Sequence, residues 1–134
     1  MIDIENEVFN VVAQAVRQQY PDVFLSGEYV KSPSSFPCIS LSMLENSVYR
    51  DSQTSACMEN HADVTYELNI YSNKAAGKKA ECKELAAFVD ELLASLGFTR
   101  TMLKTIPNLD DATIYRMTGR YKAIISNNKI IFRR

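Results

Sequence analysis

The sequence predicts an α+β fold, a two-layer sandwich in which two helices pack on one face of a mostly antiparallel sheet. Residues 62–72 have a strand pattern, with apolar side chains at every second position: Val64, Tyr66, Leu68 and Ile70. The residues that follow, up to Gly97, have a helix pattern with apolar side chains at three- and four-residue spacing: Leu85, Phe88, Val89, Leu92, Leu93 and Leu96. Residues 112–125 alternate again, which indicates a second long strand. We expect all elements to pack on this central strand and helix in a single domain spanning residues 1–134.

Residues 3–20 are predicted to form the first helix. Its expected apolar stripe consists of Ile4, Val8, Val11, Val12, Ala15 and Val16. Asp3 can cap the start of this helix, and Glu5 and Glu7 lie in the first turn, where the helix dipole favours negative charge. Pro21 ends the helix, because proline disfavours helical geometry in the residue before it.

Three shorter strands are expected around the central unit. Residues 23–30 form one, interrupted by Gly27, and residues 98–106 form another. Residues 38–44 alternate strictly, with serines on one side and three apolar residues on the other: Ile39, Leu41 and Met43. These strands complete the sheet on which the helices pack.

The ends of the second helix and the last turn also have recognisable signals. Ser72 or Asn73 is expected to cap the start of the helix, and Gly97 is expected to end it in the left-handed conformation. Residues 126–128 are expected to form a tight turn, in which asparagine suits a positive φ. Residues 129–134 then close a hairpin with the preceding strand.

Residues 45–60 are polar, lack sustained periodicity and join two convincing strands. Connections of this length tend to be functional or disordered. The alternative is that the two strands continue into the segment as a protruding hairpin. Tyr49 stands beside Arg50, a pairing of residue types common in interface cores, so the segment is a candidate partner-binding element.

The composition is that of an ordinary globular domain, with 46% hydrophobic and 23% charged residues. The formal net charge of -1 gives no electrostatic reason to expect nucleic-acid binding. No apolar run approaches the ~20 residues that span a bilayer, and the acidic N-terminal residues do not read as a secretory signal, so no membrane association is expected. The cysteines form no CxxC pair and are expected to be free thiols in a reducing cytoplasm, with the last of them a small core residue: Cys38, Cys57 and Cys82.

The sequence contains no recognisable catalytic machinery. His61 is its single histidine, so one chain cannot build a Ser-His-Asp triad or a histidine-rich metal set. Glu59, His61 and Asp63 alternate, but a solvated strand entrance is favoured over metal binding because no further ligands can be assigned. Lysines in residues 74–83 are interleaved with glutamates, which favours a solvated helix face over a basic patch. We therefore predict no enzymatic activity, no metal and no cofactor.

Arg116 and Arg120 share one face of the last long strand with Thr118. Two guanidinium groups on one sheet face can grip the carboxylates of a neighbouring subunit. They can equally be ordinary exposed residues, and the sequence leaves both interpretations open.

Three segments together resemble the tail terminator (tail completion) proteins of long-tailed phages, which are often encoded in prophages: HADVTYELNIYSN, GKKAECKELAAFVDELLASLGF and IYRMTGRYKAII, followed by a short final strand. The resemblance covers most of the chain, from the PCISLSMLEN segment to Arg134, and the first helix is in the expected place. It rests on a pattern of strand, helix and Arg-Tyr strand, not on a catalytic signature.

The resemblance implies a small α/β protein that assembles as a ring, typically a hexamer, on the head-proximal end of the tail tube. There it stops tube polymerisation and presents a surface to the head connector, without cofactor or catalysis. The implied partners are further copies of the chain, the tail tube protein and the head connector protein, in the host cytoplasm during assembly and then in the virion tail. By position, residues 45–60 would contact the tube or a neighbouring subunit, and the arginine face would be a subunit contact. The candidate contact residues are Glu45, Tyr49, Arg50, Asp51, Glu59, Arg116 and Arg120.

Two alternatives remain. The protein can be a head–tail connector (neck) component: abnormally long tails on loss of the gene favour the terminator, and normal detached tails favour the connector. It can also be a small cytoplasmic ligand-binding domain or enzyme that uses Glu59 and His61, which a bound metal or small molecule after purification would support. For the terminator, deleting residues 48–58 is expected to leave a folded protein that no longer caps tails.

Overall fold

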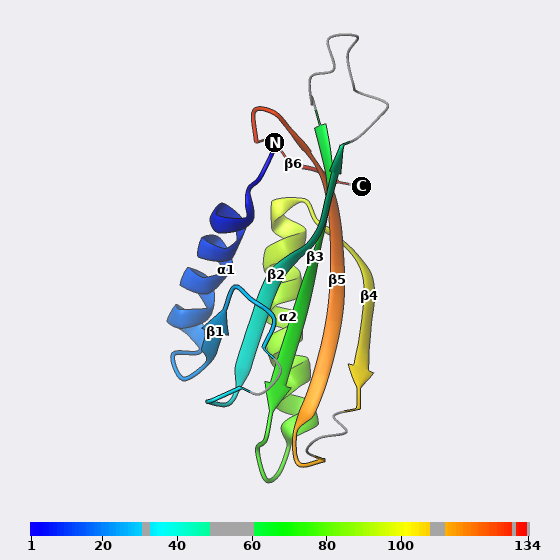
Figure 1. Cartoon of the computed structure of the whole chain (residues 1–134). Helices are drawn as coiled ribbons and strands as arrows, with labels where there is room; N and C mark the ends of the chain where they lie inside the picture. Colours follow the sequence, from blue (N-terminus) through cyan, green and yellow to red (C-terminus); the bar gives the residue numbers. More distant parts are fainter. Residues whose placement is uncertain (31–32, 49–60, 108–111, 130, 134) are drawn as a thin grey trace.

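The structure, a computed structural model, describes residues 1–30, 33–48, 61–107, 112–129 and 131–133. Within these ranges the chain forms two helices and six strands, in the order α1 (Glu5–Gln19), β1 (Phe24–Ser26), β2 (Cys38–Val48), β3 (His61–Ser72), α2 (Lys78–Leu96), β4 (Thr99–Ile106), β5 (Tyr115–Ser126) and β6 (Ile131–Arg133). Figure 1 shows one sheet with both helices behind it. The predicted two-layer α+β fold is confirmed.

The described strands form a single mixed sheet in the order β1-β2-β3-β5-β4, with β6 paired to the far end of β5. All neighbouring pairs are antiparallel except β1 and β2, which run parallel. The central pair is regular: β3 and β5 match from His61 opposite Ser126 to Ser72 opposite Tyr115. Residues opposite each other in this register point to the same face, so the register assigns every side chain to the helix side or to the helix-free side.

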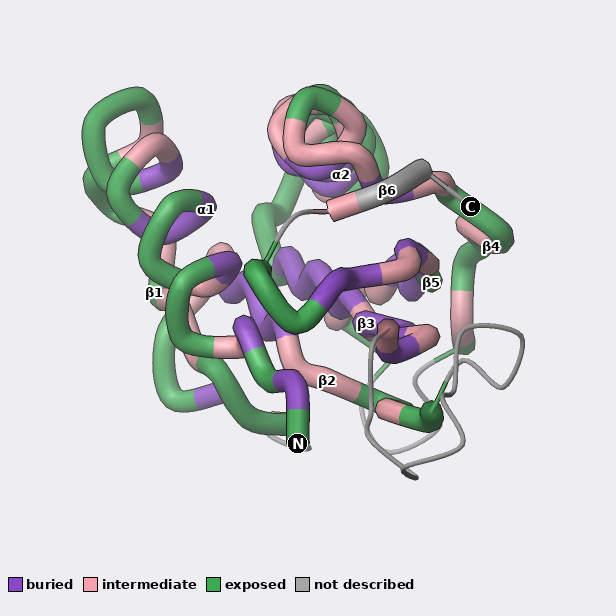
Figure 2. Tube along the Cα trace, turned by 90° about the horizontal axis from the view of Figure 1, so that it is seen from above, coloured by how far each residue is buried: buried purple, intermediate pink, exposed green. Residues whose placement is uncertain are grey.

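The hydrophobic core lies between the helices and the sheet, as Figure 2 shows by the buried residues on the facing sides. The predicted strand positions of β3 are all buried: Val64, Tyr66, Leu68 and Ile70. The predicted α2 stripe is confirmed, since every member is buried or packs against the core: Leu85, Phe88, Val89, Leu92, Leu93 and Leu96. In α1 the stripe is narrower than expected, because Val11 is 45% exposed. Ala13, which is not part of the predicted stripe, is buried.

The start of α2 differs from the prediction. The helix begins at Lys78 after Gly77, which has φ +87°, and neither Ser72 nor Asn73 caps it. Ser72 is the last residue of β3 and is fully buried, so its hydroxyl bonds within the fold and donates to Glu81 Oε1 at 2.6 Å. The strand β3 therefore includes Ser72, a residue that from the sequence alone is an equally good helix cap.

One strand boundary and one backbone conformation also differ from the prediction. The strand expected over residues 23–30 is only Phe24–Ser26, because the Ser26 hydroxyl accepts the backbone N–H of Glu28 and turns the chain away. In the last turn the positive φ belongs to Lys129 (62°) and not to an asparagine. Its N–H donates to the Ser126 carbonyl at 2.9 Å, and this bond closes the turn that was predicted at residues 126–128.

The segment predicted as a polar connection begins as strand. β2 continues past a bulge between Met43 and Glu45 and pairs with β3 as far as Val48 opposite Ala62. The alternative of strands that continue into the segment thus holds for residues 45–48. Residues 49–60 lie outside the described part of the chain.

Gly97 ends α2 in the left-handed conformation, as predicted, with φ +105°. A Cβ at this position would lie 3.0 Å from Ile131 Cγ2, whereas at Gly77 nothing lies within 4 Å. We expect Gly97→Ala to lower the free energy of unfolding by about 2 kcal/mol, and Gly77→Ala by about 1 kcal/mol, since both pay left-handed strain but only the first also crowds β6. Urea unfolding followed by circular dichroism measures both. Equal losses would mean that the contact with Ile131 carries no cost.

Tyr66 and Tyr121 are both buried in the core but differ in whether the hydroxyl is hydrogen-bonded. Tyr66 is 1% exposed and its hydroxyl has no hydrogen-bond partner in the described part of the chain, whereas the Tyr121 hydroxyl donates to Asp90 Oδ1 at 2.8 Å. An unsatisfied buried hydroxyl is costly, so Tyr66→Phe should leave stability unchanged or raise it by up to about 1 kcal/mol. Tyr121→Phe should lower it by about 1 kcal/mol. Thermal unfolding measures the change in stability of each variant. A large loss of stability in Tyr66→Phe would mean that the Tyr66 hydroxyl does make a stabilising hydrogen bond.

Candidate interaction surface

The face of the sheet opposite α1 and α2, here called the helix-free face, carries a buried polar cluster, although neither helix of the described residues covers it. Ser40, Asn69 and Tyr71 are each at most 1% exposed, and none of them is part of the core cluster between the helices and the sheet. They are covered in part by the chain that follows β1, because the Ser40 hydroxyl donates to the Glu28 carbonyl at 2.7 Å and the Tyr71 hydroxyl to the Val30 carbonyl at 2.7 Å. The chain after β1 thus crosses the lower end of the sheet in Figure 1.

Asn69 is the centre of this cluster. Its side-chain oxygen accepts three hydrogen bonds: from Arg116 Nη2 at 2.9 Å, from Arg116 Nε at 3.2 Å and from Thr118 Oγ1 at 2.7 Å. Its side-chain amide donates to Glu67 Oε1 at 3.1 Å. The register explains the grouping, since Asn69 lies opposite Thr118, Glu67 opposite Arg120, and Tyr71 opposite Arg116. The strand pairing therefore builds the cluster directly.

Arg116 is held in place by neutral groups. Its guanidinium lies over the rings of Tyr71 and Tyr29, at 5.5 and 5.7 Å from the ring centroids, and hydrogen-bonds the Asn69 amide oxygen. Two of the five guanidinium N–H groups are used by Asn69. Within the described part of the chain it forms no ion pair with a carboxylate. Arg116 is thus an oriented, half-buried cation, and some of its donors have no acceptor among the described residues.

The other predicted contact residues are distributed as follows. Arg120 lies on the same face as Arg116 and forms a 3.5 Å ion pair with Glu67, its side chain 48% exposed. Glu45 is exposed and lies opposite Thr65 on β3, which lies opposite Lys122 on β5. Glu45 is therefore on the same face as Arg116 and Arg120, next to the pair formed by Glu67 and Arg120. The remaining predicted residues, which the structure does not describe, are Tyr49, Arg50, Asp51 and Glu59.

Sequence reasoning missed the residues that organise this face. The spacing of Glu67, Asn69 and Tyr71 on the second face of a strong strand was a signal, since all three alternate against the apolar positions. Their pairing with the arginines could not be predicted, because strand register depends on contacts between distant segments. Tyr29 had no signal, because it reaches Arg116 only through the path of the chain after β1.

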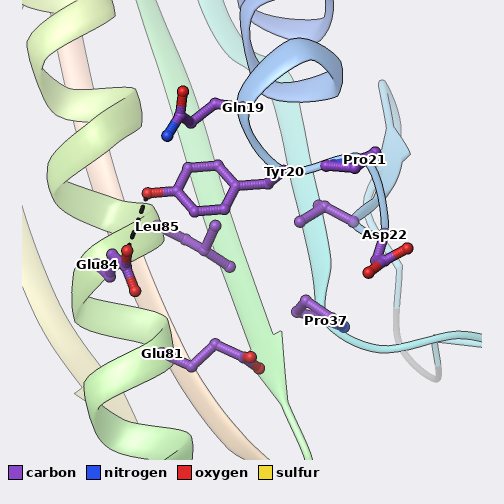
Figure 3. A pocket seen from close by; sticks show the side chains of 9 residues that line it. Gln19, Tyr20, Pro21, Asp22, Pro37, Glu81, Glu84 and Leu85 are labelled. Carbon is purple, nitrogen blue, oxygen red and sulfur yellow. Dashed lines mark hydrogen bonds between the residues drawn. The ribbon is translucent and has the colours of Figure 1, made fainter.

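A second feature is an acidic hollow of about 310 Å³ on the helix side, between the end of α1 and the first turns of α2. Figure 3 shows Tyr20 projecting into it with its hydroxyl on Glu84, a hydrogen bond of 3.2 Å. Among the described residues that line the hollow, Asp22, Glu81 and Glu84 are acidic and none is a lysine or arginine. Burial, with a smaller contribution from Glu84, raises the pKa of the Tyr20 hydroxyl, so this group remains a neutral donor to the carboxylate. The hollow accordingly concentrates negative charge.

The buried thiols are not suited to nucleophilic chemistry. Burial raises the pKa of Cys38 to about 11 and the pKa of Cys82 to about 12, so both stay protonated at neutral pH. Cys82 is a fully buried core residue, as predicted.

Among the residues that the structure describes, no group of three or more His, Cys, Asp or Glu side chains is placed to hold a metal ion. Within the same residues, neither helix is long and apolar enough to cross a membrane.

Comparison with models of known protein families and with curated proteins finds no match to this sequence.

Proposed function

We propose that this protein is a virion assembly protein that closes the head-proximal end of a phage tail tube as a ring of identical copies. In this role it ends polymerisation of the tube and offers the surface that the head joins. Its partners are further copies of the chain, the tail tube protein and the head connector protein, and it catalyses no reaction. The proposal starts from the resemblance of the β3, α2 and β5 segments to tail terminator proteins.

The observation that carries the proposal is the prebuilt arginine cluster on the helix-free face. Arginine and tyrosine are, with tryptophan, the residue types enriched among the side chains that contribute most to binding at protein interfaces. Arg116 is already oriented by Asn69 and by the ring of Tyr29, which is 54% exposed. A side chain that is fixed before binding loses little conformational entropy on binding, so the cluster is suited to a protein contact.

Loss of the gene in the phage or prophage that carries it tests the function. Tails seen by negative-stain electron microscopy should be longer than normal and should lack heads, and a plasmid copy of the gene should restore their length. Headless tails of normal length would instead favour a head–tail connector. Normal virions in normal number would overturn both roles.

A further inference from the structure

Two charged features of the structure lack an ion-pair partner among the described residues. Arg116 is held by an amide and two aromatic rings, and no carboxylate pairs with it in the described residues. In the acidic hollow, Glu84 accepts a hydrogen bond from Tyr20 and Glu81 accepts one from Ser72, so hydroxyl groups orient both carboxylates. A cation fixed by neutral groups and carboxylates fixed by hydroxyls are complementary in charge.

The lysines near the hollow do not neutralise it. Lys78, one helical turn before Glu81, directs its Nζ to the carbonyl of Thr113 at 3.3 Å. Lys83 lines a different hollow on the other side of α2, together with Asp90 and Arg100. Of the ion pairs found within the described residues, none involves a carboxylate of the acidic hollow.

The two features lie at the same end of the sheet but on opposite faces. Ser72 lies opposite Tyr115, and its hydroxyl donates to Glu81 on the helix side. Arg116, the residue after Tyr115, lies on the helix-free side opposite Tyr71. Both features are therefore at nearly one level along the strands, at the lower end in Figure 1. A head-to-tail contact closes into a ring only if its two surfaces lie at one level along the rotation axis, and otherwise builds a helical filament.

We propose that Arg116 of one copy binds Glu81 and Glu84 in the acidic hollow of the next copy, so that this head-to-tail contact repeats around a ring. The inference rests on the proposed function and gives it a specific subunit contact. Arginine is suited to this contact because its planar guanidinium presents several donors to carboxylate oxygens at once. The exposed ring of Tyr29 would cover the ion pair from one side and limit its hydration.

Sedimentation velocity of the full chain over a concentration series at low ionic strength tests the contact. The wild-type protein should self-associate, and Arg116→Gln should weaken association about tenfold or more, because one partner of a desolvated charge pair is lost. Arg100→Gln is the matched control: it removes the same charge from the helix side of the sheet, where Arg100 pairs with Asp90 at 3.2 Å, and should associate like the wild type. Circular dichroism verifies that each variant is folded.

A charge exchange tests the pairing independently of any change in fold. Arg116→Glu alone and the double variant Glu81→Lys, Glu84→Lys alone should both be monomeric, because each places like charges across the contact. When the two variants are mixed, they should associate as alternating copies. The side chain at position 116 of each variant then meets opposite charges at positions 81 and 84 of the other. The assemblies should therefore contain even numbers of chains.

Three results would overturn the inference: a wild-type protein that stays monomeric throughout, an Arg116→Gln protein that associates like the wild type, or a mixture of the reversed variants that remains monomeric. These results are separable from the test of function. A monomeric protein whose gene loss gives long tails would retain the terminator role without this contact. An associating protein whose gene loss leaves tail length normal would retain the contact without that role.

Discussion

Replacing Leu68 by alanine should lower the free energy of unfolding by about 3 kcal/mol. Leu68 is fully buried in the central strand β3, where it pairs with Leu41 on one side and Gly119 on the other. Gly119 has no side chain, so the residue directly opposite Leu68 on β5 cannot fill the space that the leucine leaves. The lost burial and the remaining cavity therefore add, and urea unfolding followed by circular dichroism measures the sum.

The control for this prediction is Leu44→Ala. Leu44 lies in β2 and is 49% exposed, so the same truncation there should cost well under 1 kcal/mol. If both variants lost similar stability, the cost would reflect strand propensity and not the core. A small loss in Leu68→Ala would mean that the surrounding side chains close the cavity.

Replacing Asn69 by leucine should also cost about 3 kcal/mol, although leucine is more hydrophobic and the site is fully buried. The reason is the oxygen that leucine lacks, which accepts two N–H groups of Arg116 and the hydroxyl of Thr118. Without it, a half-buried cation and a buried hydroxyl lose their acceptor. Thermal unfolding gives the loss of stability, and amide hydrogen exchange near Tyr29 should become faster as Arg116 is released.

Thr118→Val is the matched control for the Asn69 cluster. It removes one donor and keeps the shape of the side chain, and the Asn69 oxygen still accepts from Arg116. The expected cost is about 1 kcal/mol, clearly smaller than that of Asn69→Leu. If Asn69→Leu and Thr118→Val lost the same stability, Asn69 would not be the centre of the cluster. Unchanged hydrogen exchange near Tyr29 in Asn69→Leu would contradict it in the same way.

The long periodic segments were predictable from the sequence. β3 and β5 alternate over many residues because one side packs on the core, and the α2 stripe recurs at helical spacing for the same reason. The end of α2 at Gly97 was also predictable, since a left-handed residue there favours glycine. The alternation likewise placed Arg116 and Arg120 on one face.

The short and irregular elements were not predictable. β1 has three residues and pairs parallel to β2, and a run of three residues has too little periodicity to indicate a partner or a direction. The start of α2 was wrong by several residues, because Ser72 is a plausible cap in isolation and becomes a buried strand end only through its bond to Glu81. In both cases contacts between distant residues overrode the local signal.

The sequence by itself determined the fold class and which faces of α2, β3 and β5 pack on the core. It also determined that two arginines lie on one sheet face. Periodicity and local conformation are properties of short segments, so they can be recognised without the tertiary structure. Only the tertiary structure decided what those arginines touch. Asn69 meets Arg116 because β3 pairs with β5 in one register, and Tyr29 meets it because the chain after β1 crosses that face. The acidic hollow likewise exists only where the end of α1 meets the start of α2, since Tyr20 and Glu84 are 64 residues apart in the chain.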